Sequence, residues 1–104
     1  MLIGSDIMKV YTLLHETYGW WDNDYNVDIY TFKDRQSAIN YLKILSEMLI
    51  EDALKHNDMK IEDFENNDYD YLDQEEDYLY IRIEEWGSDT LSIRETDLME
   101  MIEV

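Results

Sequence analysis

The sequence predicts an α+β fold, a two-layer sandwich in which one long helix covers one face of a four-stranded antiparallel sheet, in the order ββαββ. Three observations predict it. Two strand-like stretches come first, a segment with apolar residues at helical spacing follows, and two more alternating stretches come after it. Hydrophobic residues make up 45% of the 104-residue chain, which is enough for the core of one domain.

The N-terminal part predicts a hairpin after a loose arm. Residues 1–7 show no periodicity and are expected to form that arm, so residues 8–104 form the single domain, and the natural start is either Met1 or Met8. Residues 9–15 alternate as a strand, with Leu13 and His15 on one face. Residues 27–32 are β-branched or aromatic and predict the second strand of the hairpin.

A long helix is predicted over residues 35–55. Asp34 is a suitable N-cap residue, and Lys55 and His56 suit the negative end of the helix dipole. Asn57 is expected to end the helix in a left-handed conformation. The apolar stripe that should face the sheet consists of Ala38, Leu42, Leu45, Leu49 and Ala53.

The second half of the chain predicts two further strands. Residues 59–64 suit one helical turn, and the acidic residues after it are expected to cross to Tyr78 without regular structure. A strand over residues 78–86 should turn its alternate residues inward, and a turn at residues 87–89 should lead to a fourth strand that ends near Glu95. For residues 97–102 a short helix and a strand both remain open. The inward residues are Leu79, Ile81, Ile83, Leu91 and Ile93.

Charge is the strongest feature of the sequence. The formal net charge is −18, from 26 acidic and 8 basic residues, and residues 61–104 carry 16 of the acids and 2 of the bases. Such a charge repels phosphates, so direct binding of nucleic acid is not expected. The densest part, here called the acidic segment, contains no Lys or Arg; its carboxylates are Glu62, Asp63, Glu65, Asp68, Asp70, Asp73, Glu75, Glu76 and Asp77.

Catalytic and cofactor-binding motifs are absent from the sequence. There is no Cys, and His15 and His56 are placed beside no nucleophile arrangement, so a solvated or structural role is favoured for both. No glycine-rich phosphate loop, zinc-ligand spacing or stretch of membrane-spanning length occurs. The sequence therefore predicts a non-enzymatic protein without cofactor or membrane span.

One stretch of the sequence partly matches a calcium-binding loop. Residues 22–28 have the spacing of the first ligands of an EF-hand loop, but Val27 stands where the loop needs Gly and Lys33 stands where it needs the bidentate Glu. No dedicated metal site is expected.

Three interpretations of the acidic segment are open: a solvated loop, a docking surface for a basic protein, or an imitation of nucleic acid. Fully extended at about 3.3 Å per residue, the segment carries about one charge per 6 Å, whereas one DNA strand carries one per about 3.4 Å. Imitation therefore requires a compact fold with further carboxylates from Glu84, Glu85, Asp89, Glu95, Asp97, Glu100 and Glu103. Aromatic anchors for a partner are expected at Trp20, Trp21, Tyr69 and Tyr71.

A small, Cys-free, Tyr-rich chain with acids clustered over residues 63–77 and at Glu84-Glu85 resembles the small acidic anti-defence proteins of phages and mobile elements, of the anti-CRISPR or DNA-mimic type. The resemblance implies a non-catalytic inhibitor in the cytoplasm of a bacterial host. It would occupy the basic, nucleic-acid-binding surface of a partner, such as a CRISPR or other defence nuclease, and compete with DNA or RNA.

Two other functions are compatible with the sequence. The first is an intracellular interaction or toxin-immunity module that does not imitate nucleic acid. The second is a housekeeping domain of a halophile, although the near-neutral residues 34–60 argue against acidity spread over every surface. The identity of the partner and the oligomeric state are open.

Overall fold

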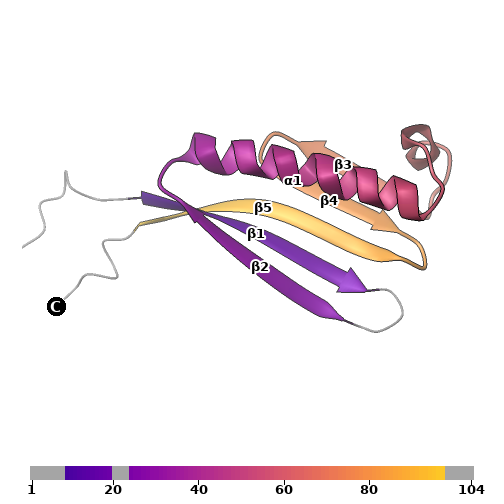
Figure 1. Ribbon diagram of the computed structural model, residues 1–104, viewed down its shortest axis with the longest axis horizontal. Coiled ribbons are helices and arrows are strands. Elements are labelled where there is room, and N and C mark those ends of the chain that lie inside the picture. The colour runs from indigo at the N-terminus through magenta and orange to yellow at the C-terminus, as the bar shows by residue number, and fades with distance from the viewer. Residues whose placement is uncertain (1–8, 20–23, 98–104) are drawn as a thin grey trace, which may run out of the picture.

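The described chain, residues 9–19 and 24–97 of a computed structural model, forms one five-stranded antiparallel sheet with one α-helix across one face (Figure 1). The strand order is β2-β1-β5-β4-β3, which puts β2 and β3 at opposite edges. In chain order the elements are β1 (Lys9–Gly19), β2 (Tyr25–Phe32), α1 (Arg35–His56), the short 3-10 helix η2 (Ile61–Phe64), β3 (Tyr71–Glu75), β4 (Tyr78–Ile83) and β5 (Gly87–Asp97).

The predicted four-stranded sheet in ββαββ order is therefore wrong, because the chain forms β3 within the acidic segment. β3 pairs with β4 from Tyr71 opposite Arg82 to Glu75 opposite Tyr78, so only two residues connect the strands. The sequence of β3, YLDQE, has no β-branched residue, and its connection lacks the glycine that usually marks a tight hairpin. The pairing with the strongly predicted β4 supplies the stabilisation that local propensity does not.

The turn predicted at residues 87–89 is also wrong, since these residues begin β5. The chain reverses three residues earlier, where Glu85 adopts a left-handed conformation with a φ of 66° and the Trp86 amide donates to the Ile83 carbonyl at 3.0 Å. Gly87 has a φ of 137°, and a Cβ there would overlap the carbonyl oxygen of Tyr18. β5 thus starts directly against the end of β1 and pairs with it from Gly87 opposite Gly19 to Asp97 opposite Lys9.

The helix begins as predicted and ends differently. The Asp34 carboxylate accepts hydrogen bonds from the Ser37 amide at 2.7 Å and from the Ser37 hydroxyl at 3.0 Å. Asn57 ends the helix with a φ of −108°, so the prediction of a left-handed Asn57 is wrong, and the left-handed residue is Asp58 with a φ of 50°. The side-chain Nδ2 of Asn57 instead donates to the Ala53 carbonyl oxygen at 2.8 Å. An amide side chain thus caps the helix C-terminus directly.

The core lies between α1 and one face of the sheet. All the inward residues predicted for the second half of the chain point into it. Small residues let the helix approach the strands, since Ala38, Ser46 and Ala53 are all at most 1% exposed. The fully buried residues of this layer include Leu13, Leu42, Leu79 and Leu91. Among the described residues, no element covers the opposite face, which we call the open face.

Several predictions fall on residues outside the described ranges. These are the N-terminal arm at residues 1–7, Trp20 and Trp21, and the structure of residues 98–102. Within the described ranges, no helix has the length and apolarity needed to cross a membrane.

Candidate binding surface

The acidic segment follows one edge of the molecule. It begins in η2, passes through the loop at residues 65–70, runs along β3 and ends in the turn before β4. Because β3 is an edge strand, its outer side has no neighbouring strand among the described residues. We call the acidic segment together with Glu84 and Glu85 the acidic edge.

One ion pair and one shared hollow place the two ends of the acidic edge near the two ends of the helix. At one end Arg35, the first residue of α1, lies 3.2 Å from the Asp77 carboxylate. At the other end Asp70 and Glu84 line a hollow together with Asn57, the residue that caps the helix C-terminus. With 22 residues at about 1.5 Å each, the helix is about 33 Å long. Eleven carboxylates over this length give about one charge per 3 Å, close to the 3.4 Å of one DNA strand.

Folding therefore supplies the density that the extended segment lacks, through the chain reversal at β3 and the approach of the β4–β5 connection. The Asp70 carboxylate accepts a hydrogen bond from the Glu84 amide at 2.8 Å, which brings Glu84 and Glu85 beside the acidic segment. Asn67 holds the preceding loop, because its side-chain oxygen accepts from the amides of Tyr69 at 3.0 Å and Asp70 at 2.7 Å. The loop that carries the acids is thus fixed by its own hydrogen bonds.

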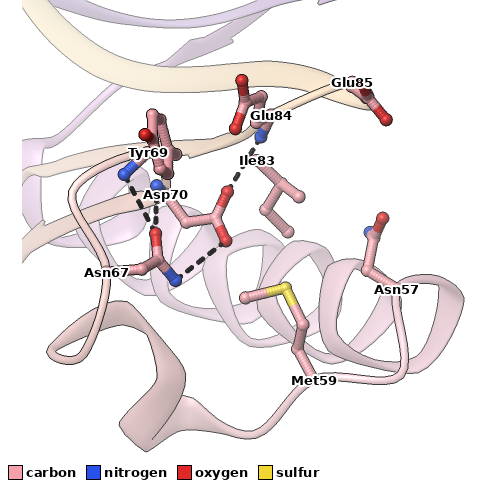
Figure 2. Close-up of a pocket in the computed structure, with 8 residues that line it drawn as sticks. All are labelled: Asn57, Met59, Asn67, Tyr69, Asp70, Ile83, Glu84 and Glu85. Atoms are coloured by element: carbon pink, nitrogen blue, oxygen red, sulfur yellow. Dashed lines mark hydrogen bonds between the residues drawn. The ribbon is translucent and has the colours of Figure 1, made fainter.

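A hollow of about 480 Å³ lies at the η2 end of the acidic edge (Figure 2). Figure 2 shows the Asp70 carboxylate bound to Asn67 and to the Glu84 backbone, with the Met59 and Asn57 side chains on the opposite side of the hollow. Asp70, Glu84 and Glu85 line the hollow, and its lining contains no Lys or Arg. Its lining is mostly polar and includes three carboxylates, with Met59 and Ile83 as apolar members, and this combination suits a long cationic side chain.

Tyrosines extend from the acidic edge onto the open face. Tyr69 is 63% exposed and Tyr71 is 54% exposed, and the Tyr71 ring lies 5.8 Å from that of Tyr80. Burial, followed by the negative charge of Asp73, raises the pKa of Tyr78. These rings are accessible for contact with cations, because the face of a phenol ring attracts Lys and Arg.

Of the other carboxylates named as contributors, Asp89 and Glu95 do not join the acidic edge, and the side chain of Asp97 lies outside what the structure describes. Asp89 is buried, and Glu95 lies 3.0 Å from Lys9 at the far end of β1. Positions 100 and 103 lie outside the described residues, as do both tryptophans. The acidic edge is therefore confined to η2, the loop after it, the β3–β4 hairpin and the β4–β5 connection.

A polar cluster on the helix side of the sheet was not predicted from the sequence. His15 Nε2 lies 2.8 Å from Asp89 Oδ1, and the Thr17 hydroxyl donates to the same oxygen at 2.9 Å. Asp89 is 6% exposed, and Asp28 lies 4.0 Å from the other ring nitrogen of His15. Thr17 and Asp89 are directly opposite each other in β1 and β5, so only the register of this long-range pair could have revealed the cluster.

The described part of the chain contains one Thr-His-Asp cluster and no group of potential metal ligands. His15 and Thr17 both bind one oxygen of the buried Asp89 carboxylate, and the Thr17 hydroxyl also lies 3.2 Å from His15 Nε2. No group of three or more potential metal ligands occurs among the described residues. The residues of the EF-hand-like spacing from Tyr25 onward form strand β2 rather than a loop.

Comparison with known proteins does not place the chain: no protein-family model, curated protein or solved structure matches it.

Proposed function

We propose that this protein is a non-catalytic inhibitor whose acidic edge binds a basic, nucleic-acid-binding surface of a partner protein and competes there with DNA or RNA. The observation that carries the proposal is the clustering of eleven carboxylates along one edge about as long as α1, an average of about one carboxylate per 3 Å over about 33 Å. One nucleic-acid strand carries a phosphate about every 3.4 Å, so a groove that binds such a strand is suited to a surface of similar charge density. The partner we propose is a bacterial nuclease, of which CRISPR and other defence nucleases are the expected examples.

The neighbouring groups support the same mode of binding. The hollow lined by Asp70, Glu84 and Glu85 suits one Lys or Arg side chain of the partner. Exposed Tyr69 and Tyr71 add aromatic contacts, which give affinity that does not disappear in salt. Carboxylates on the rim steer the approach, so we expect fast association that slows as ionic strength rises.

A two-stage experiment tests the proposal. Proteins from a bacterial lysate are captured on the immobilised chain at low salt, released at high salt and identified. Each captured protein is then purified and mixed with a fluorescent DNA or RNA oligonucleotide, and the anisotropy is followed as this protein is added. The proposal predicts that the oligonucleotide is displaced, and that displacement weakens as salt is raised.

Two results would contradict the proposal. In one, the captured proteins bind no nucleic acid, which favours a toxin-immunity or adaptor module using the same acidic edge. In the other, the oligonucleotide stays bound in a ternary complex, which shows that the acidic edge contacts a surface other than the nucleic-acid site.

A further inference from the structure

The outer side of β2 differs from the outer side of β3 in its protection against strand pairing. β2 has eight residues, YNVDIYTF, with one carboxylate and no Lys, Pro or Gly. Its register with β1 is continuous from Tyr25 opposite Tyr18 to Phe32 opposite Tyr11, so no bulge twists the edge away. Charges, proline and bulges are the usual devices that stop edge strands from pairing with another chain. Apart from its single carboxylate, β2 has none of them.

We propose that two copies of this chain pair through β2, antiparallel to each other, to form one continuous ten-stranded sheet. A two-fold axis perpendicular to the sheet relates the copies, since only this axis makes side-by-side identical strands antiparallel. The two helices therefore lie on the same face, and the two open faces join. Backbone hydrogen bonds supply most of the affinity, as in other cases of strand addition. This proposal is independent of the proposed function.

The register of the pair follows from symmetry and charge. Residues directly opposite in an antiparallel pair point to the same face, so the axis must pass beside one residue of β2. A centre at Asp28 or at Ile29 gives the longest overlap, over residues 25–31 or 26–32. The Asp28 centre places two carboxylates directly opposite each other, which is unfavourable. The Ile29 centre places Ile29 beside Ile29 of the second copy and Asp28 opposite Tyr30.

Side-chain exposure agrees with this centre. Ile29 is 63% exposed on the open face, the largest exposed fraction of any apolar side chain in β2. Val27 on the same face would lie opposite Thr31 of the second copy. The pair therefore covers an exposed isoleucine with its own equivalent, whereas the isolated chain leaves it in water.

The eleven carboxylates of the acidic edge do not oppose this arrangement, because the two acidic edges lie at the far sides of the assembly. β3 is four strands away from β2, so nine strand spacings separate the two acidic edges in the dimer. At about 4.8 Å per spacing, this distance is about 43 Å. Charges are screened over about 8 Å at physiological ionic strength, so repulsion between the two acidic edges is small.

Cysteine crosslinking tests both the pairing and the register. The chain contains no Cys, so a single introduced thiol can react only with its equivalent in another copy. In the proposed register the Cα atoms at position 29 lie about 4.5–5.5 Å apart, within the range that a disulfide spans. We expect Ile29→Cys to give a disulfide-linked dimer under mild oxidation. Thr31→Cys should remain monomeric, because four residues of offset separate its equivalents by about 14 Å.

Sedimentation equilibrium of the unmodified chain and of Ile29→Lys provides the second test. The wild-type chain should associate to a dimer, and Ile29→Lys should weaken this association about tenfold or more by placing two ammonium groups opposite each other. Tyr71→Lys, a change on the β3 edge at a residue that is 54% exposed, should leave association unchanged. A monomeric wild-type chain at every concentration, or faster crosslinking at position 31 than at position 29, would overturn the proposal.

Discussion

The two edge strands of the sheet differ in charge: β3 is surrounded by carboxylates, whereas β2 contains one. The β3 edge carries carboxylates on and around five residues, and its flanking loops are fixed by hydrogen bonds such as that from the Glu84 amide to Asp70. The β2 edge has eight residues with one carboxylate and an exposed isoleucine at its middle. Acidic residues thus prevent strand pairing at the β3 edge and leave it available for basic surfaces, whereas the β2 edge remains competent for pairing.

The difference between the two edges leads to the question of where the acidic residues lie on the molecule. The helix carries Glu47, Glu51 and Asp52, but Lys43 and Lys55 lie near them in sequence and reduce the local charge. On the acidic edge, Arg35 and Arg82 are the nearby cations with defined contacts, to Asp77 and to the Tyr69 carbonyl. The acidic edge holds 11 of the 26 acidic residues, and the other 15 are distributed over the rest of the chain.

The largest effect is expected from Gly87→Ala, which breaks the connection between the two halves of the sheet. The new Cβ would overlap the Tyr18 carbonyl oxygen, and alanine disfavours a φ of 137°. We expect a loss of about 3 kcal/mol or more in the free energy of unfolding, measured by urea denaturation. Gly19→Ala is the matched control, because its nearest contact would be 3.5 Å from the Asp24 Cβ, an ordinary distance. Equal losses for both variants would show that the close approach is not what limits position 87.

Asp89→Ala tests whether the buried carboxylate between β1 and β5 contributes to stability and not to partner binding. Removing it leaves His15 and Thr17 without their shared acceptor, so we expect a loss of about 2 kcal/mol in urea denaturation. Asp89→Asn keeps an acceptor oxygen and should lose about half as much. Because Asp89 is buried away from the acidic edge, partner binding at a temperature where both variants are folded should be unchanged. Weaker binding by the folded Asp89→Asn variant would place Asp89 in the binding surface.

Ser46→Ala should increase stability without changing the acidic edge. The Ser46 hydroxyl is buried under α1 beside the groove formed by Gln74, Glu75 and Glu76, and it has no hydrogen-bond partner. Removing an unsatisfied buried hydroxyl and raising helix propensity should add about 1 kcal/mol to the free energy of unfolding. Thermal denaturation measures it. A loss of stability would show that the hydroxyl is bonded in solution.

The smallest effect is expected from replacing Asp34, the N-cap residue of α1. The Ser37 amide, followed by the Ser37 hydroxyl, lowers the pKa of Asp34. The folded state therefore holds the proton less tightly than the unfolded state, so this contribution is present above the ordinary Asp pKa of about 4 and is lost as the pH falls through the lower folded-state value. Asp34→Ala should melt at a lower temperature than the wild type at neutral pH, and the difference should narrow on acidification. Ser37→Ala, which retains the amide donor, should show a smaller difference.

The sequence predicted those elements whose residues show a local periodicity. The helix start at Asp34, the hairpin of the first two strands, and the inward residues of β4 and β5 are confirmed. β3 escaped prediction because its five residues include no β-branched residue and three of them are Asp, Gln or Glu, so the strand depends on its pairing with β4. The β5 start escaped prediction because Gly87 suggested a turn, whereas it serves a close approach between two strands.

For the binding surface, composition predicted the acidic segment but not its shape. Its charge density depends on the β3–β4 hairpin, which has no glycine to mark its turn, and on the Asp70 contact to the β4–β5 connection, which joins residues 14 positions apart. The burial of Asp89 had no local signal either, since it depends on the register of β5 against β1. The roles of Tyr69 and Tyr71 as anchors stay predictions.

The central claim, that the acidic edge is the binding site, is tested most directly by two charge-reversal variants in the oligonucleotide-displacement assay. One carries Glu62→Lys, Asp68→Lys and Glu76→Lys on the acidic edge, and the other carries Glu47→Lys, Glu51→Lys and Asp52→Lys on the helix. All six residues are exposed, and the two variants have the same net charge. We predict that the first variant loses displacement by at least about a hundredfold while the helix variant retains most of it. Equal losses in both variants would show that net charge alone drives binding, and would contradict the claim.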